Sequence, residues 1–185
     1  MCEKKDVRNS VKLILLNERN ELLLMSTDDK GIQGKKGNYN GRFWQMIGGK
    51  IEEGETLKEG AYRELFEETG LTKEQVSVGE PAWYGEVDLM MHGILTTVKQ
   101  SFVPARTISS NVSLSNLTEE EKSVCTKLEW FSLEKIKSCP DIIYPVLLTD
   151  PRYLPAILAG NVPENVIDID LTIQPKKREE IDMER

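Results

Sequence analysis

The sequence predicts one domain with a mixed α/β fold. Six short apolar runs have the length and composition of β-strands. Between them lie segments that begin with helix-capping residues, so helices are interspersed with strands along the chain. The 185 residues are enough for one compact domain with a substantial core and too few for two comfortable ones.

The predicted strands are defined by apolar runs between turn residues. The first two are joined by a short polar turn and are typical of a β-hairpin. The polar, glycine-rich segment 26–42 that follows them predicts a long flexible loop. In chain order, the strands are expected at 11–17, 21–25, 43–47, 82–90, 94–103 and 128–131.

The predicted helices are marked by their ends. Thr56 forms a capping box with Glu59, and Gly70 is a typical helix stop, so a helix is expected between them. Thr118 and Glu121 form a second capping box, which predicts a brief helix. Further helices are expected within 133–136 and 144–158.

The last part of the chain differs from the rest. Beyond Asn161 the chain alternates apolar and acidic residues, and it ends in a charged segment, 176–185, which predicts a frayed end. We therefore expect a single domain over residues 1–160 and a partly flexible C-terminal extension over residues 161–185.

Composition excludes several classes of function. The net charge of −7 argues against a large nucleic-acid footprint, which needs a basic face, although small phosphate substrates remain possible. No apolar run approaches the roughly 18 residues of a membrane span, and the N-terminus lacks the apolar core of a secretory signal. Three cysteines without metal-like spacing favour reduced thiols in a cytoplasmic protein. A single histidine, His92, excludes metal sites that need a histidine pair. The sequence is compatible with a homodimer.

The most informative segment is 49–71, where acids are concentrated. Glu64, Glu67 and Glu68 have spacings of three and four residues, which place them on one arc of a helix. At about 100° per residue, Glu64 and Glu68 fall beside the apolar stripe that starts at Leu57. The alternative, a solvated acidic face, does not account for acids at the edge of a buried stripe. Crowded, partly buried carboxylates repel one another, and a cation relieves this; oxygen ligands favour Mg²⁺ or Mn²⁺.

This segment resembles the Nudix box, G-x5-E-x7-R-E-U-x-E-E-x-G-U, where U is a bulky aliphatic residue. Every specified position is filled, by Gly49, Glu55, Arg63, Glu64, Leu65, Glu67, Glu68, Gly70 and Leu71. A full chance match in a chain of this length has a probability on the order of 10⁻⁷ or lower. The resemblance implies the family fold, a mixed sheet between helices in an α/β/α sandwich, and hydrolysis of a pyrophosphate bond.

The resemblance also implies a divalent-metal site. Its ligands would be Glu64, Glu67, Glu68 and the carbonyl of Gly48, and its metal Mg²⁺ or Mn²⁺. The ions would neutralise charge on a diphosphate while water attacks phosphorus.

The implied catalytic residues extend beyond the metal ligands. Arg63 would orient the carboxylates by pairing with Glu55. A general base is expected among the box glutamates or on a later loop, where Glu121 is our candidate; its alternative role is to cap the helix with Thr118. The catalytic set is therefore Arg63, Glu64, Glu67, Glu68 and Glu121.

The substrate is less well defined by the sequence. We expect a nucleoside diphosphate-linked small molecule, either an oxidised nucleoside triphosphate or an ADP-ribose-like compound. The alternatives are a catalytically silent nucleotide sensor and an RNA 5′-end pyrophosphohydrolase. Trp83 and Tyr84 are candidates for stacking on a nucleobase, although packing in the sheet is the more common role of such residues.

Overall fold

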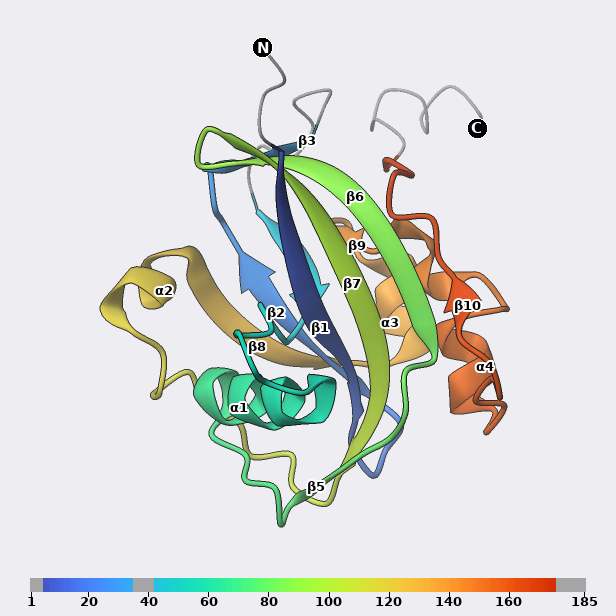
Figure 1. Ribbon diagram of the computed structural model, residues 1–185. Helices are drawn as coiled ribbons and strands as arrows, with labels where there is room; N and C mark the ends of the chain where they lie inside the picture. The colour runs from blue at the N-terminus through green and yellow to red at the C-terminus, as the bar shows by residue number, and fades with distance from the viewer. Residues whose placement is uncertain (1–4, 35–41, 176–185) are drawn as a thin grey trace.

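A curled sheet of mixed strand direction runs through the protein, and helices lie on both of its faces (Figure 1). The computed structural model describes residues 5–34 and 42–175. Helix α1 (Leu57–Thr69) packs on one face of the sheet, whereas α3 (Leu133–Ser138) and α4 (Leu154–Leu158) pack on the other. The arrangement confirms the predicted mixed α/β sandwich.

The order of the strands in the sheet differs from their order in the sequence. The main path is β10-β6-β7-β1-β2-β4-β9, with β8 paired to β2, β3 to β6 and β5 to β7. In chain order the strands are β1 (Asp6–Leu16), β2 (Leu22–Thr27), β3 (Ile32–Gly34), β4 (Phe43–Met46), β5 (Val76–Val78), β6 (Trp83–Met91), β7 (Ile94–Thr107), β8 (Cys125–Phe131), β9 (Ile142–Tyr144) and β10 (Ile167–Asp168). Two short helices, α2 (Glu119–Val124) and the 3₁₀ helix η1 (Val146–Thr149), complete the described elements.

Strand β1 is the centre of the molecule because both of its faces are covered. Val11, Leu13 and Leu15 belong to the cluster beneath α1, while Ile14 and Leu16 belong to the cluster beneath α3 and α4. A strand buried on both faces reads as a nearly continuous apolar run, which is why this segment was recognisable as a strand from its sequence. Its whole length pairs in parallel with β7.

The double glycine at 48–49 is fixed against the middle of β1. After β4 the chain continues antiparallel to β1, and the backbone N–H of Leu13 donates to the carbonyl of Ile47 at 2.9 Å. The N–H of Val11 donates to the carbonyl of Gly49 at the same distance. The loop that leads into α1 is therefore attached to the most deeply buried strand of the fold.

Helix α1 has the boundaries that its capping residues predicted. The Thr56 side chain accepts the N–H of Glu59, and the Glu59 carboxylate accepts the N–H of Thr56 at 2.8 Å. Gly70 ends the helix in the left-handed conformation, with φ of 73°, which a glycine adopts without steric cost. Ala61 and Leu65 are fully buried against the sheet, which fixes the rotation of the helix about its own axis.

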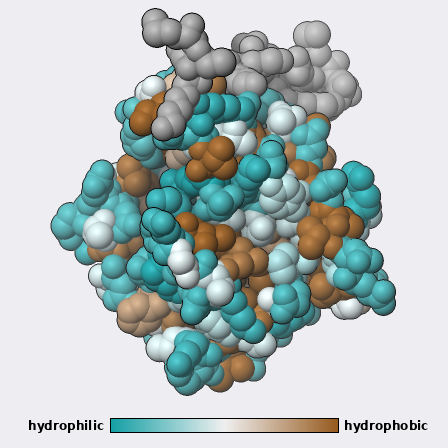
Figure 2. All heavy atoms as spheres, in the orientation of Figure 1, coloured by the Kyte–Doolittle hydropathy of each residue, from teal (hydrophilic) through white to brown (hydrophobic). Residues whose placement is uncertain are grey.

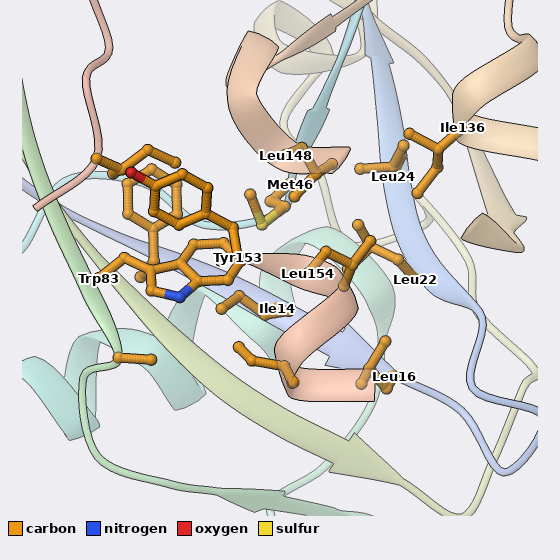
Figure 3. Close-up of a cluster of buried hydrophobic side chains, with 14 of the residues drawn as sticks. Ile14, Leu16, Leu22, Leu24, Met46, Trp83, Ile136, Leu148, Tyr153 and Leu154 are labelled. Atoms are coloured by element: carbon orange, nitrogen blue, oxygen red, sulfur yellow. The ribbon is translucent and has the colours of Figure 1, made fainter. Parts of the chain in front are cut away.

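The cluster beneath α3 and α4 contains the largest buried side chains (Figure 3). The rings of Trp83 and Tyr153 meet edge to face with their centroids 5.4 Å apart, next to Leu154 and Ile14. Trp83 is completely buried and also lies against Phe102. Trp83 is thus a packing residue and does not present a free face to a nucleobase.

Two regions depart from the predicted elements. The region 144–158, expected to be helical, begins at the end of strand β9 and contains only η1 and α4, because its prolines lack the N–H that a continuous helix needs. The loop predicted at 26–42 contains strand β3, which pairs with the end of β6. Residues 35–41 of that loop, which include Lys35 and Lys36, lie outside the described residues, as do Cys2 and the charged end at 176–185.

The segment beyond residue 160 contributes to the core. Strand β10 pairs in parallel with β6, and the hydroxyl of Tyr153 donates to the carbonyl of Asp168 at 2.9 Å. Ile169 and Leu171 are buried in the cluster beneath α4. At least part of this segment is therefore ordered against the sheet.

The outer surface is mostly polar on the side shown in Figure 2, where hydrophobic residues form small groups among hydrophilic ones. No helix in the described part of the chain is long and apolar enough to cross a membrane. Cys125 and Cys139 are free thiols.

Candidate active site

A cavity of about 730 Å³ opens between α1, the double-glycine loop and the curled sheet. Its volume lies in the range of roughly 300–1,000 Å³ that is typical of small-molecule sites. One part of its wall is polar and consists of Arg8, Ser10, Lys12, Gly48, Gly49, Lys50, Glu52, Arg63, Glu64, Glu67, Glu68 and Glu121. Another part is apolar and consists of Met25, Ile32, Phe43, Met46, Val87, Leu89, Met91, Val98, Phe102 and Tyr144.

The three acids of α1 are buried to different extents. Glu64 and Glu68 are each only 9% exposed, whereas the side chain of Glu67 is 44% exposed. The helical projection predicted this difference, because Glu64 and Glu68 border the buried stripe of the helix. Burial raises the pKa of Glu64, which the neighbouring charge of Arg63 partly offsets. Burial also raises the pKa of Glu68, to about 7, against the opposing charge of Lys12.

Arg63 connects the loop to the helix acids. Its Nε and Nη2 donate to the two carboxylate oxygens of Glu55, at 2.8 and 3.0 Å. Its Nη1 donates to Glu64 at 2.9 Å and to Glu67 at 3.0 Å. A fifth hydrogen bond, from Nη2 to the carbonyl of Lys50 at 2.8 Å, attaches the guanidinium to the loop. These partners raise the pKa of Arg63, so its positive charge is permanent.

Gly48 is held from both sides. Its N–H donates to Glu68 at 2.6 Å, and its carbonyl accepts from the ammonium of Lys12 at 2.9 Å. Its φ is +118°, and a Cβ at this position would lie 2.2 Å from the carbonyl oxygen of Val11. A Cβ on Gly49 would lie 2.5 Å from a carboxylate oxygen of Glu64. Gly48 is therefore required for the close approach of loop and strand, whereas a side chain at position 49 would displace the carboxylate of Glu64.

The comparisons with known proteins agree with this arrangement. A family-model comparison matches residues 6–147 to the NUDIX domain. The chain belongs to the Nudix family. The oxidized purine nucleoside triphosphate hydrolase of Mus musculus is 31% identical to it over 127 residues, which are 64% of this chain and 71% of the mouse protein.

Solved structures give the same family and fold. The MutT protein from Methanosarcina mazei Go1 has a TM-score of 0.60 and 26% identity, over 86% of this chain and 99% of the archaeal one. An Ap4A hydrolase from C. elegans has a TM-score of 0.54 and 22% identity, over 83% and 98% of the two chains, and shows likeness of fold alone. This Nudix protein is accordingly an enzyme of the pyrophosphohydrolase class.

Nudix enzymes use divalent metal ions, and the donor atoms of this site fit such an ion chemically. The donors are all oxygens, and a cation would offset the cost of ionising Glu64 and Glu68 in a buried position. In the part of the chain that the structure describes, no three acidic, cysteine or histidine side chains converge on one point. The guanidinium of Arg63 bridges Glu64 and Glu67 and acts as their counter-charge.

Glu121 lies on the cavity wall of the Nudix enzyme and also caps α2. One oxygen of its carboxylate accepts both the N–H and the hydroxyl of Thr118, each at 2.8 Å. The structure thus brings Glu121 to the same cavity as the box residues. It also shows the capping role that the sequence offered as the alternative.

Sequence reasoning missed two parts of the cavity. Lys12 interrupts the apolar run of β1, and this interruption was the available signal for a buried functional or structural cation. Phe43 and Tyr144 form an edge-to-face aromatic pair, with centroids 5.5 Å apart, on the apolar wall. No local signal identified them, because they meet only through the pairing of β4 with β9. Tyr84, a stacking candidate, is not among the residues that line this cavity, and its hydroxyl donates to Glu86.

Proposed function

We propose that this Nudix enzyme hydrolyses the pyrophosphate bond of a nucleoside diphosphate-linked substrate, either an oxidised nucleoside triphosphate or an ADP-ribose-like compound. The proposal assigns Mg²⁺ or Mn²⁺ to Glu64, Glu67, Glu68 and the carbonyl of Gly48. The observation that carries it is the pair of buried carboxylates on one wall of a cavity whose other wall is apolar and aromatic. A diphosphate with its cation suits the first wall and a nucleobase suits the second.

The residues of the chain supply orientation and proton transfer. Arg63 holds the carboxylates of Glu64 and Glu67, and the N–H of Gly48 holds that of Glu68. When bound, a divalent cation neutralises the diphosphate and makes phosphorus more electrophilic. A cavity carboxylate then accepts the proton of the attacking water. The proposal assigns this step to Glu121, with a box glutamate as the alternative.

The oxidised-nucleotide substrate has the more direct support. The mouse relative, whose name states hydrolysis of oxidised purine nucleoside triphosphates, shares 31% of its residues with this chain over the aligned region. The apolar wall with Phe43 and Tyr144 is suited to a planar base.

A nucleotide panel tests the proposal directly. Purified protein with Mg²⁺ or Mn²⁺ should release a mononucleotide from at least one panel member, and EDTA should stop the reaction. Products identified by mass will show which bond is cleaved. If no member is turned over, the nucleotide substrate is wrong and a sensor role takes its place.

Matched variants test the metal assignment. Glu67→Gln and Glu68→Gln should lower turnover by orders of magnitude, while Glu53→Gln should leave it unchanged, because Glu53 lies exposed in the loop at an unspecified position of the box. Full activity in either box variant would contradict the assignment.

Glu121→Gln tests the general base. It should lower kcat if Glu121 is the base, whereas an unchanged kcat would mean that a box glutamate accepts the proton.

A further inference from the structure

Strand β1 places two cations on the cavity wall, and they differ in how they are bonded. Arg8, Ser10 and Lys12 alternate along the strand and therefore point to the same face, next to Gln100 of β7. The ammonium of Lys12 has all three protons engaged, by the side-chain oxygen of Gln45 and the carbonyls of Met46 and Gly48. Lys12 is thus occupied in fixing β4 and the double glycine to β1.

Arg8 has no such set of partners. Its side chain is half-buried, and only its Nε is engaged, in a hydrogen bond of 3.3 Å to the hydroxyl of Ser10. Within residues 5–34 and 42–175, Nη1 and Nη2 have no hydrogen-bond acceptor and Arg8 forms no ion pair. Glu64, whose charge acts on Arg8, already accepts a hydrogen bond from Arg63. Four N–H groups of the guanidinium are therefore available in the cavity.

The backbone beneath Arg8 is rigid, so this availability is not a result of a loose chain end. The residue lies within the long parallel pairing of β1 and β7, opposite Val98. Its neighbour Asn9 accepts the N–H of Ile51 at 2.9 Å, which ties β1 to the loop that precedes α1. Burial lowers the pKa of Arg8, and the negative charges of Glu64 and Glu52 counter this. A guanidinium that is partly removed from water without gaining an acceptor is destabilised, and a bound anion offsets that cost.

We infer that Arg8 binds a phosphate of the substrate from the β1 wall, by a forked contact of Nη1 and Nη2 with non-bridging oxygens. The planar guanidinium matches phosphate geometry better than an ammonium does. This inference rests on the proposed function, because it takes the polar wall to be the polyphosphate site. It adds a contact outside the Nudix box, from strand β1.

Kinetics of Arg8→Gln and Arg8→Lys test the contact. A charge-assisted bond contributes about 1.5–3 kcal/mol, so Arg8→Gln should raise KM roughly 10- to 100-fold, with a smaller change in kcat. Arg8→Lys should recover part of the loss. Arg106→Gln is the matched control, since Arg106 is exposed on β7, bonded to Asn20 and absent from the cavity wall. If the role of Arg8 were purely structural, Arg8→Gln would instead lower the unfolding temperature and leave KM unchanged.

A binding measurement separates this inference from the proposed function. Calorimetry with inorganic pyrophosphate and Mg²⁺ requires no turnover, and Arg8→Gln should weaken binding by a similar factor relative to wild type and Arg106→Gln. If wild type hydrolyses no nucleotide yet binds pyrophosphate through Arg8, the proposed function fails and the phosphate contact stands. Equal pyrophosphate affinity and equal KM in Arg8→Gln and wild type overturn the contact, and so does an absence of pyrophosphate binding by wild type.

Discussion

The carboxylate of Glu68 accepts the backbone N–H of Gly48 at 2.6 Å, across 20 residues of sequence. This bond joins the last acid of the Nudix box to the loop that precedes the box. The carboxylate is nevertheless held in an unfavourable place, because burial raises the pKa of Glu68 to about 7. The proposed metal-binding role and the stability of the fold therefore make opposite demands on this residue.

The first prediction concerns the stability of a Glu68→Gln variant without metal. Glutamine has nearly the same shape and keeps an oxygen to accept the N–H of Gly48, and a neutral amide is less costly to bury than a carboxylate. We expect its unfolding temperature to equal or exceed that of wild type, as measured by calorimetry in EDTA. Added Mg²⁺ should then stabilise wild type more than the variant. A lower unfolding temperature in EDTA would mean that the charge of Glu68 stabilises the fold.

The second prediction concerns Arg63→Lys. A lysine keeps the charge but cannot contact both oxygens of Glu55 while also reaching Glu64 and Glu67. Because these groups are partly exposed, we expect a modest loss of stability, about 1–2 kcal/mol, and a fall in kcat of at least tenfold. Chemical denaturation and steady-state kinetics measure the two effects.

Glu55→Gln is the partner variant for Arg63→Lys. It should lose less activity, because Arg63 retains its contacts with Glu64 and Glu67. If Arg63→Lys kept wild-type kcat, the positive charge of Arg63 would be sufficient for turnover, and its paired hydrogen bonds to Glu55 would not be needed.

The fold could be predicted where the signals were local. Thr56 and Glu59 cap the start of α1 and Gly70 caps its end, each through contacts within about one turn, so the ends of α1 followed from the sequence. Strands β9 and β10 are three and two residues long and exist because they pair with β4 and β6. Such short strands have no period of their own to detect, and the pairing partners lie far away in the sequence.

The candidate site likewise has a part that could be predicted from the sequence and a part that could not. The box acids could be placed because one helix carries all three and its buried stripe orients them. The contact of Lys12 with Gly48, by contrast, depends on the register of β1 against the chain after β4. Whether Nη1 and Nη2 of Arg8 have acceptors depends on which groups its neighbours already bind, and no pattern of residue types encodes that.

The third prediction concerns the reactivity of Cys125, which lines the cavity. Burial and the charge of Glu68 raise its pKa to about 11. In a variant with Cys2 and Cys139 changed to Ser, alkylation by iodoacetamide should be slow at about pH 8 and should keep rising beyond about pH 10. The unfolded variant should reach half of its maximal rate near pH 9, the ordinary pKa of a thiol. A half-maximal rate near pH 9 in the folded protein would contradict the raised pKa.

The raised pKa of Cys125 also makes the stability of the fold depend on pH. Between pH 9 and 11 the folded protein retains a proton on Cys125 that the unfolded chain has lost. Stability should therefore fall as the pH rises through this window. Cys125→Ser should reduce the slope of stability against pH there, as measured by denaturant unfolding at several pH values.

The fourth prediction concerns the proposed domain boundary at residue 160. Ile169 and Leu171 are 2% and 8% exposed, in the cluster that contains Trp83 and Tyr153. Large-to-small changes at such sites cost about 2–5 kcal/mol each, which is a large share of a typical total of about 5–15 kcal/mol. We expect Ile169→Ala and Leu171→Ala each to lower the unfolding temperature, by roughly 2–4 °C for every kcal/mol lost.

Val166→Ala is the matched control, because Val166 is 50% exposed and its truncation should change the unfolding temperature little. A chain ending at residue 160 should be less stable than either core variant, since it loses both side chains, strand β10 and the bond from Tyr153 to Asp168. If that shortened chain unfolded at the wild-type temperature, the boundary predicted at residue 160 would be correct. The packing of β10 on β6 would then add nothing to the stability of the Nudix domain.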